Sequence, residues 1–158
     1  MAAGRYLAVA GILLLLALAG CGGSDEGATA GTAATLSKAE FLKKANAICE
    51  RGTDRIDAAY GRAGEHVPKG AENEDFMNEA AARIVIPVRR EELRKIRALG
   101  LPAGNEETIE AFLVALKEGI ERGERNHPSL RASGGASYAF EKAYKIANKH
   151  ELSSCFLG

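Results

Sequence analysis

The chain has 158 residues and carries 21 Lys or Arg against 21 Asp or Glu, so its formal net charge is zero. This balance argues against nucleic-acid binding, which requires a strongly basic face. The apolar run from Leu7 to Leu18 holds 12 residues, fewer than the roughly 20 that a membrane-spanning helix needs. No later segment is apolar enough to span a membrane, so any membrane contact is expected to come from a lipid alone.

The first 20 residues predict a secretory signal. Arg5 precedes the apolar run, and the run leads into Leu18-Ala19-Gly20-Cys21. A small residue before a cysteine at this place resembles the lipobox of bacterial lipoproteins. The resemblance implies that residues 1–20 are removed and that the Cys21 thiol is acylated, with palmitate for example. Cys21 would then anchor the chain at the extracytoplasmic face of the cell membrane.

An ordinary secreted protein is the alternative to the lipid anchor. Ala17-Leu18-Ala19 also fits a signal-peptidase site that would release a soluble chain beginning at Gly20. The cysteine count favours the anchor, because lipidation of Cys21 leaves Cys49 and Cys155 as an even pair in an oxidising compartment. A simply secreted chain would carry one unpaired cysteine.

A polar segment follows the lipobox. Gly22 to Thr35 is rich in Gly, Ala, Thr and Ser and has no large apolar residue, which predicts a flexible tether. Its r.m.s. span is about 20 Å, from roughly 5–6 Å times the square root of its length. The predicted domains are a signal peptide at 1–20, the lipidated cysteine and tether at 21–35, and a helical domain at 36–158.

A capping box predicts where the helical domain begins. Ser37 stands at the N-cap and Glu40 three residues later, with Leu36 before them as a hydrophobic staple. Apolar or small residues then recur at spacings of three and four, as on one face of a helix that ends near Gly64. They are Phe41, Ala45, Ile48, Cys49, Gly52, Ile56, Ala59 and Ala63.

A second helix is predicted from about Asn73 to Leu99. Its apolar residues are Phe76, Met77, Ala80, Ala81, Ile84, Val85, Val88, Leu93, Ile96 and Leu99. Pro87 lacks an N–H and crowds the preceding turn, so the pattern fits either one kinked helix or two abutting helices.

Two further helices complete the predicted domain. Asn105 is expected to cap the third helix, which ends at His127-Pro128. Its apolar residues are Ile109, Phe112, Leu113, Leu116 and Ile120. The fourth is expected from about Ala136 and carries Phe140, Ala143, Tyr144 and Ala147. Strand signals are absent, so the predicted fold class is all-α, an up-down bundle of about four amphipathic helices.

Cys49 and Cys155 are expected to form a structural disulfide. Cys49 lies on the apolar face of the first helix, about 18 Å from Ser37 at 1.5 Å per residue. An antiparallel fourth helix of about 14 residues would end partway along the first, and residues 151–155 can cover the remaining gap. Buried free thiols or a reactive cysteine are the alternatives, and the apolar neighbours of Cys49 disfavour reactivity.

These features together resemble a group of small cysteine-containing lipoproteins of actinobacteria. The matching segments are the lipobox ending at Cys21, the tether, Leu36-Ser37-Lys38-Ala39-Glu40-Phe41 leading to Ala47-Ile48-Cys49, and the closing Cys155. Members of the group usually place a glycine just after the last helix, where this chain has Glu151. The resemblance implies a helical extracytoplasmic lipoprotein, with no known activity and no functional residues beyond the cysteines.

No residue pattern predicts an enzyme or a metal site. Glu124 and His127 have the Glu-x-x-His spacing of di-iron bundles, but those sites need two such motifs and two further carboxylates. A solvated helix end explains the two residues better. His66 and His150 have no partner at ligand spacing. We therefore predict no catalytic residue, no metal and no cofactor.

Six basic residues are predicted to share one face of the second helix. They are Arg83, Arg89, Arg90, Arg94, Lys95 and Arg97. Such a face could meet anionic lipid headgroups or an acidic partner. The interleaved Glu91 and Glu92 make an ordinary solvated face the preferred interpretation.

Gly119 and Gly123 lie one turn apart beside the apolar stripe of the third helix. Each costs roughly 1 kcal/mol of helix stability relative to Ala, so each is expected to have a structural reason. Close approach of a neighbouring helix is the favoured reason, and a ligand that presses on bare backbone is the alternative.

The function predicted from these observations is a membrane-anchored, non-enzymatic module that binds a partner or a component of the cell envelope. The alternative is a small-molecule-binding protein with a pocket between the helices near Pro87 and Gly119. An enzyme is the least favoured class.

Overall fold

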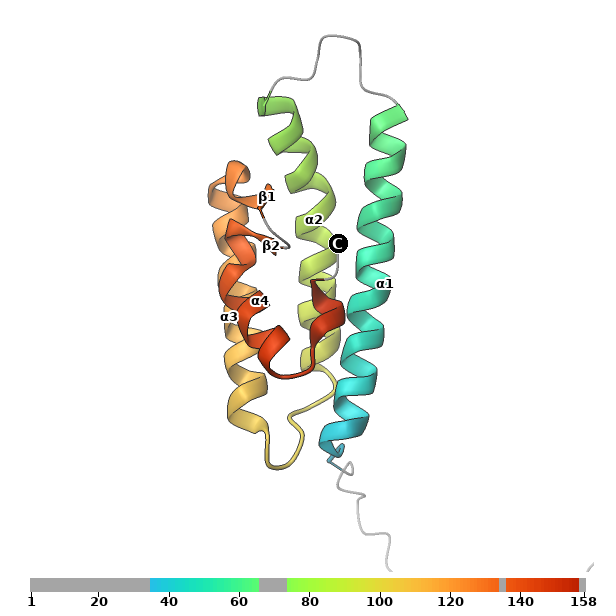
Figure 1. Cartoon of the computed structure of the whole chain (residues 1–158), viewed down its shortest axis with the longest axis vertical. Helices are drawn as coiled ribbons and strands as arrows, with labels where there is room; N and C mark the ends of the chain where they lie inside the picture. The colour runs from blue at the N-terminus through green and yellow to red at the C-terminus, as the bar shows by residue number, and fades with distance from the viewer. Residues whose placement is uncertain (1–34, 66–73, 134–135, 157–158) are drawn as a thin grey trace, which may run out of the picture. The chain divides into compact units, whose positions relative to one another are not determined.

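The helical domain is an all-α bundle, as the sequence predicts. The computed structural model describes residues 35–65, 74–133 and 136–156. Its helices are Lys38–Glu65 (α1), Glu74–Arg97 (α2), Glu106–Arg125 (α3) and Glu141–Lys149 (α4), and they run alternately up and down (Figure 1). The predicted signal peptide, Cys21 and the tether lie outside the described residues.

The capping box at the start of α1 is confirmed. The Glu40 carboxylate accepts hydrogen bonds from the Ser37 backbone N–H at 3.1 Å and from the Ser37 hydroxyl at 2.7 Å. The Glu40 N–H in turn donates to the Ser37 hydroxyl oxygen at 3.3 Å. These bonds lower the pKa of Glu40 and satisfy backbone donors that a helix start leaves without partners.

α2 is one continuous helix with Pro87 inside it, so the alternative of two abutting helices is wrong. Pro87 has no N–H to donate to the carbonyl of Arg83. It lies on the exposed side of α2, where its ring displaces no core side chain. More than two turns of helix stand on each side of it, and the bend predicted at Pro87 stays a prediction.

The connection from α3 to α4 differs from the sequence prediction. α3 is followed by a 3-10 helix, His127–Leu130 (η1), and a minimal antiparallel pair, Ala132–Ser133 (β1) with Ala136–Ser137 (β2). A second 3-10 turn, Tyr138–Phe140 (η2), then leads into α4. The fourth helix therefore begins at Glu141 rather than at Ala136. Two-residue strands are too short to give the alternation by which strands are found in a sequence.

The N-cap prediction for α3 is half correct. Asn105 occupies the N-cap position, but its side chain makes no capping hydrogen bond. The buried Asn105 Nδ2 has no hydrogen-bond partner among the described residues. The acidic first turn, Glu106 and Glu107, still lies at the positive end of the helix dipole.

The chain returns to α1 by a turn and not by the fourth helix itself. α4 packs on α3, and a last 3-10 turn, Ser153–Cys155 (η3), packs on α1 (Figure 1). Glu151 makes this reversal in the left-handed conformation, at φ 64°, and the Leu152 N–H donates to the Ala147 carbonyl at 2.9 Å. That bond closes a Schellman motif, in which glycine usually holds the position that Glu151 has here.

One apolar core joins all of these elements. Its fully buried side chains include Phe41, Ile96, Ile109, Phe112, Leu116 and Leu152. Within residues 35–65, 74–133 and 136–156, no helix combines the length and the apolar character that crossing a bilayer requires.

Candidate functional site

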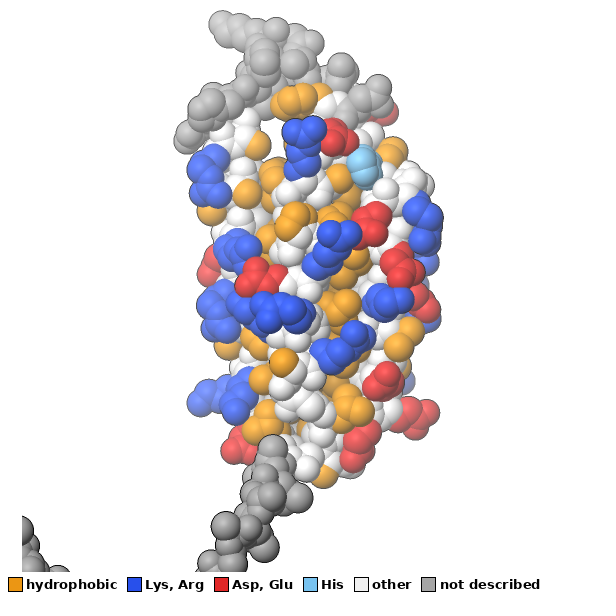
Figure 2. All heavy atoms as spheres, turned by 180° about the vertical axis from the view of Figure 1, so that it is seen from behind, with side chains coloured by type: hydrophobic (Ala, Val, Ile, Leu, Met, Phe, Trp, Pro, Cys, Tyr) orange, Lys and Arg blue, Asp and Glu red, His pale blue; other side chains and the backbone are white. Residues whose placement is uncertain are grey.

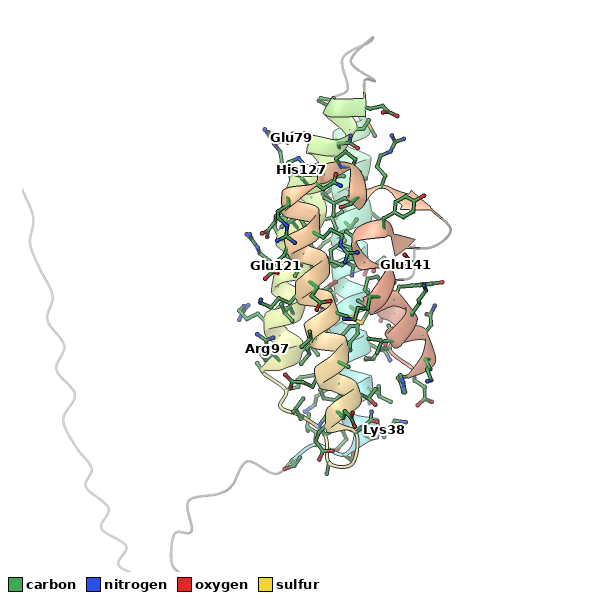
Figure 3. The ribbon with its side chains drawn as sticks, turned by 90° about the vertical axis from the view of Figure 1, so that its left-hand side faces the viewer. Lys38, Glu79, Arg97, Glu121, His127 and Glu141 are labelled. Atoms are coloured by element: carbon green, nitrogen blue, oxygen red, sulfur yellow. A yellow bond between two sulfur atoms is a disulfide. The ribbon has the colours of Figure 1, made fainter. Side chains whose placement is uncertain are left out.

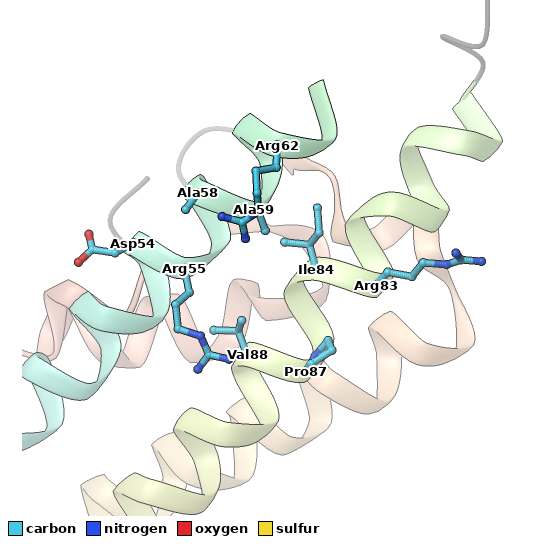
Figure 4. A pocket seen from close by; sticks show the side chains of 9 residues that line it. All are labelled: Asp54, Arg55, Ala58, Ala59, Arg62, Arg83, Ile84, Pro87 and Val88. Carbon is cyan, nitrogen blue, oxygen red and sulfur yellow. The ribbon is translucent and has the colours of Figure 1, made fainter. Parts of the chain in front are cut away.

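A hollow of about 400 Å³ lies between α1 and α2 at the level of Pro87 (Figure 4). Small side chains on α1, Ala58 and Ala59, leave this space open opposite α2. The lining residues are Asp54, Arg55, Ala58, Ala59, Arg62, Arg83, Ile84, Pro87 and Val88. The hollow thus joins an apolar floor to the guanidinium groups of Arg55 and Arg62, whereas the charged groups of Arg83 and Asp54 point away from it (Figure 4).

A smaller hollow of about 90 Å³ continues along the same two helices. It is lined by Ile48, Arg51, Gly52, Arg55, Val88, Glu91, Glu92 and Lys95. Glu91 bridges the two helices there, because its carboxylate pairs with Arg55 at 2.5 Å and with Lys95 at 2.6 Å. The two cations lower the pKa of Glu91 to about 2, so it stays ionised across the physiological range.

Cationic side chains dominate the face that carries these hollows. We call the set Arg51, Arg55, Arg62, Arg83, Arg90, Arg94, Lys95 and Arg97 the arginine face. Figure 2 shows this side of the bundle, where blue side chains flank an apolar groove and red ones gather toward the edge formed by α3. Three acidic side chains form ion pairs with the arginine face: Glu91 with Arg55, Glu79 with Arg83 at 3.0 Å, and Glu124 with Arg90 at 2.5 Å.

Arg89 is not part of that face, contrary to the sequence prediction. Its side chain is buried and pairs with the buried Glu92 at 2.8 Å. The Arg89 guanidinium also donates to the carbonyl of Cys155 at 2.6 Å and lies over the Phe156 ring, 4.9 Å from its centroid. An ion pair is therefore sealed inside the bundle, between α2 and the C-terminal turn.

Gly52 makes room for the buried Glu92 carboxylate. A Cβ at Gly52 would lie 1.7 Å from the Oε1 atom of Glu92, so any side chain there would displace the carboxylate. Glu92 Oε1 and Arg89 Nε have no hydrogen-bond partner among the described residues. Burial raises the pKa of Glu92 although Arg89 opposes the shift.

The predicted pairing of Cys49 with Cys155 is present beside this ion pair. The two residues form a disulfide, with Cα atoms 4.4 Å apart, and both are buried. Asn46, one turn earlier on α1, donates to the Glu151 carbonyl at 2.8 Å and accepts from the Ser154 N–H at 3.3 Å. The C-terminal turn is thus held to α1 by one covalent bond and two hydrogen bonds.

The glycines of α3 are explained by close packing. A Cβ at Gly119 would lie 2.4 Å from the Phe140 ring, and one at Gly123 would lie 2.5 Å from Leu130. Gly119 does not line the hollow at Pro87, and the pocket predicted near both residues stays a prediction. The neighbours of Gly119 belong to the 3-10 turn η2, whereas those of Gly123 are Leu130 of η1 and Ile86 of the long helix α2.

Glu124 and His127 do not converge on a common site. Glu124 pairs with Arg90, whereas the His127 ring lies 3.1 Å from the Glu79 carboxylate. Figure 3 shows Glu79 and His127 together, toward the end of the bundle away from Lys38.

No group of three His, Cys, Asp or Glu side chains in the described part of the chain is arranged to hold a metal ion. His66 lies outside the described residues, and His150 caps α4.

No family model, no curated protein and no solved structure matches the chain. The likeness to actinobacterial lipoproteins stays a prediction from sequence.

Proposed function

We propose that the chain is a membrane-anchored extracytoplasmic lipoprotein whose helical domain is a non-enzymatic binding or envelope-interaction module. The Cys49–Cys155 disulfide is the observation that carries this proposal. It accounts for two of the three cysteines and leaves Cys21, at the end of the lipobox, as the thiol for acylation. Disulfides persist mainly in oxidising compartments outside the cytoplasm.

The surface chemistry supports binding as the activity of the module. The two hollows between α1 and α2 offer apolar floor and guanidinium groups, which suit a partner that carries negative charge. The buried ion pair lies under that surface and is enclosed by Gly52 and Phe156. The proposed role of this interior is structural.

Metabolic labelling with a palmitate analogue tests the anchor. In a bacterial host, the natural chain is expected to incorporate the label and to sediment with membranes, whereas Cys21→Ala is expected to do neither. Cys155→Ser is the matched control, because it also removes one thiol but keeps the lipobox. Equal labelling of Cys21→Ala and the natural chain would refute the proposal.

A small-molecule-binding protein is the second candidate. The volume of the hollow at Pro87, about 400 Å³, lies within the roughly 300–1,000 Å³ typical of ligand sites. Its lining selects a small organic anion with an apolar body. The test is NMR titration with short-chain and aromatic carboxylates. Shifts at Ala59 and Ile84 that disappear in Ala58→Phe would support it, and no shift with any of these acids would refute it.

A further inference from the structure

We propose that the arginine face binds the anionic phospholipid headgroups of the membrane to which the chain is anchored. The bundle would then lie lengthwise on the bilayer with α1 and α2 toward the lipid. The inference takes only the lipid anchor from the proposed function. The contact with lipid headgroups is argued from the charges of the arginine face, their ion pairs and their positions in the bundle.

The arginine face has an excess of positive charge in a chain whose formal net charge is zero. Its eight cations stand against four acidic neighbours, so about four positive charges are left over. The acidic neighbours are Asp54, Glu79, Glu91 and Glu124. Each Lys or Arg held near an anionic bilayer contributes about 1 kcal/mol of attraction.

Three arginines of the arginine face have no ion-pair partner in the part of the chain that the structure describes. Arg51, Arg94 and Arg97 are exposed, and none of them forms an ion pair within residues 35–65, 74–133 and 136–156. A guanidinium presents a planar fork of N–H donors that matches the phosphate group of a lipid. Lipid contact at these three positions therefore costs no existing salt bridge.

The charges run along the bundle instead of gathering at its tip. Arg83, Pro87, Arg90, Arg94 and Arg97 follow one another at spacings of three and four and form the exposed stripe of α2. On α1, Arg51, Arg55 and Arg62 line the same groove. A flat surface can contact both rows together only if the helix axes lie parallel to it.

The unpaired arginines of α2 also lie near the point where the tether enters. α2 ends at Arg97, and α1 begins at Lys38, at the same end of the up-down bundle (Figure 1). The tether predicted from the sequence, with an expected r.m.s. span of about 20 Å, would keep this end close to the bilayer. Such tethering raises the effective concentration of the face at the lipid surface, so weak individual contacts suffice.

Neutron reflectometry on supported bilayers tests the orientation. The mature lipidated chain is placed on bilayers rich in phosphatidylglycerol and on bilayers of phosphatidylcholine alone. α1 has 28 residues and is about 42 Å long at 1.5 Å per residue. On the anionic bilayer we expect a protein layer about 20 Å thick, two helix diameters. On the zwitterionic bilayer we expect one of about 40 Å or more, since the tether then leaves the bundle free to stand or tumble.

Charge reversal identifies the contact residues. Arg94→Glu combined with Arg97→Glu breaks no ion pair of the described structure and is expected to give the thick layer on both bilayers. The matched control is Lys43→Glu with Lys149→Glu, the same charge change on other faces, which should keep the thin layer on the anionic bilayer. Unchanged circular dichroism and Tm establish that each variant is folded.

The outcomes separate the inference from the proposed function. A layer of equal thickness on both bilayers would overturn the lipid contact and favour an acidic protein as the partner. No retention of the natural chain on the zwitterionic bilayer would refute the anchor. In that case retention on the anionic bilayer still tests the face, because it must be lost in the Arg94 and Arg97 variant and kept in the control.

Discussion

Two regions of the bundle reach close packing by different means. Where the C-terminal turn meets α1 and α2, the contact is made by a disulfide, the Asn46 amide and the buried Arg89–Glu92 pair. Where α3 meets the turns η1 and η2, it is made by aromatic and aliphatic side chains that press on glycine. The first region depends on specific partners, and the second depends on the absence of two Cβ atoms.

Loss of the disulfide is expected to have the largest effect on stability. The bond joins residues 106 positions apart, and a loop of that length is worth about 4–5 kcal/mol in the chain-entropy model. Urea unfolding should therefore shift to much lower denaturant when reductant is added. The urea concentration at which the double variant Cys49→Ala, Cys155→Ala unfolds should not change with reductant. If reductant also leaves the unfolding of the natural chain unchanged, the account is contradicted.

Removal of the Glu92 carboxylate is expected to cost almost as much. Glu92→Ala leaves Arg89 buried without its ion-pair partner, which typically costs about 3–5 kcal/mol. Glu92→Gln keeps an acceptor for Arg89 and fills the same space, so its loss in the free energy of unfolding should be much smaller. Equal losses in the two variants would mean that the negative charge of Glu92, and neither its volume nor its hydrogen bond, carries the stabilisation.

Glu92 should also give stability an unusual dependence on pH. Its pKa is raised in the folded protein, so the unfolded chain ionises this carboxyl first as pH rises. The stability of the natural chain relative to Glu92→Gln is therefore expected to fall as pH rises from about 4 through the raised pKa. Urea titrations of both proteins across this range measure the difference, and a rise would contradict the assignment.

Alanine substitution at a packed glycine of α3 should change the stability in the opposite sense to the same substitution at a glycine with open space around it. Gly119→Ala places a methyl group against the Phe140 ring and the Ala139 carbonyl, so we expect a loss of about 1–3 kcal/mol from overpacking. Gly61→Ala, at a helical position with no neighbour within 4 Å, should gain about 0.5–1 kcal/mol. Thermal unfolding compares the two, and equal signs would refute the packing explanation.

The smallest effect is expected at the turn that leads back to α1. Glu151→Gly should be more stable than Glu151→Ala by about 1 kcal/mol, because only glycine relieves the left-handed strain. Both variants lose the exposed ion pair with Lys38, so that loss cancels in the comparison. Chemical unfolding of the pair provides the measurement, and equal stabilities would show that this turn carries no strain.

Local patterns in the sequence predict most of the first three helices. The capping box at Ser37 and the spacing of apolar residues give the start of α1 and the continuation of each long helix, since both signals act within a few residues. The pairing of Cys49 with Cys155 is also predicted, because the cysteine count and the helix lengths limit the alternatives. Short 3-10 turns and two-residue strands carry no such periodic signal.

The interior ion pair is the main feature that the sequence analysis places wrongly. Arg89 and Glu92 belong by spacing to the buried stripe of Ala81, Val85, Val88 and Ile96. Because both side chains are charged, the sequence predicts that they are exposed to solvent, as most such residues are. Their burial depends on Gly52 and on the carbonyl of Cys155, partners supplied by segments far away in the chain, which local periodicity cannot reveal.

Intact-mass analysis of the protein isolated from membranes is the most direct test of the central claim that one cysteine carries lipid and the other two are joined. The account predicts a chain that begins at an acylated Cys21, with Cys49 and Cys155 resistant to alkylation until a reductant is added. An unmodified chain that begins at another residue, or two thiols that react without reductant, would contradict it.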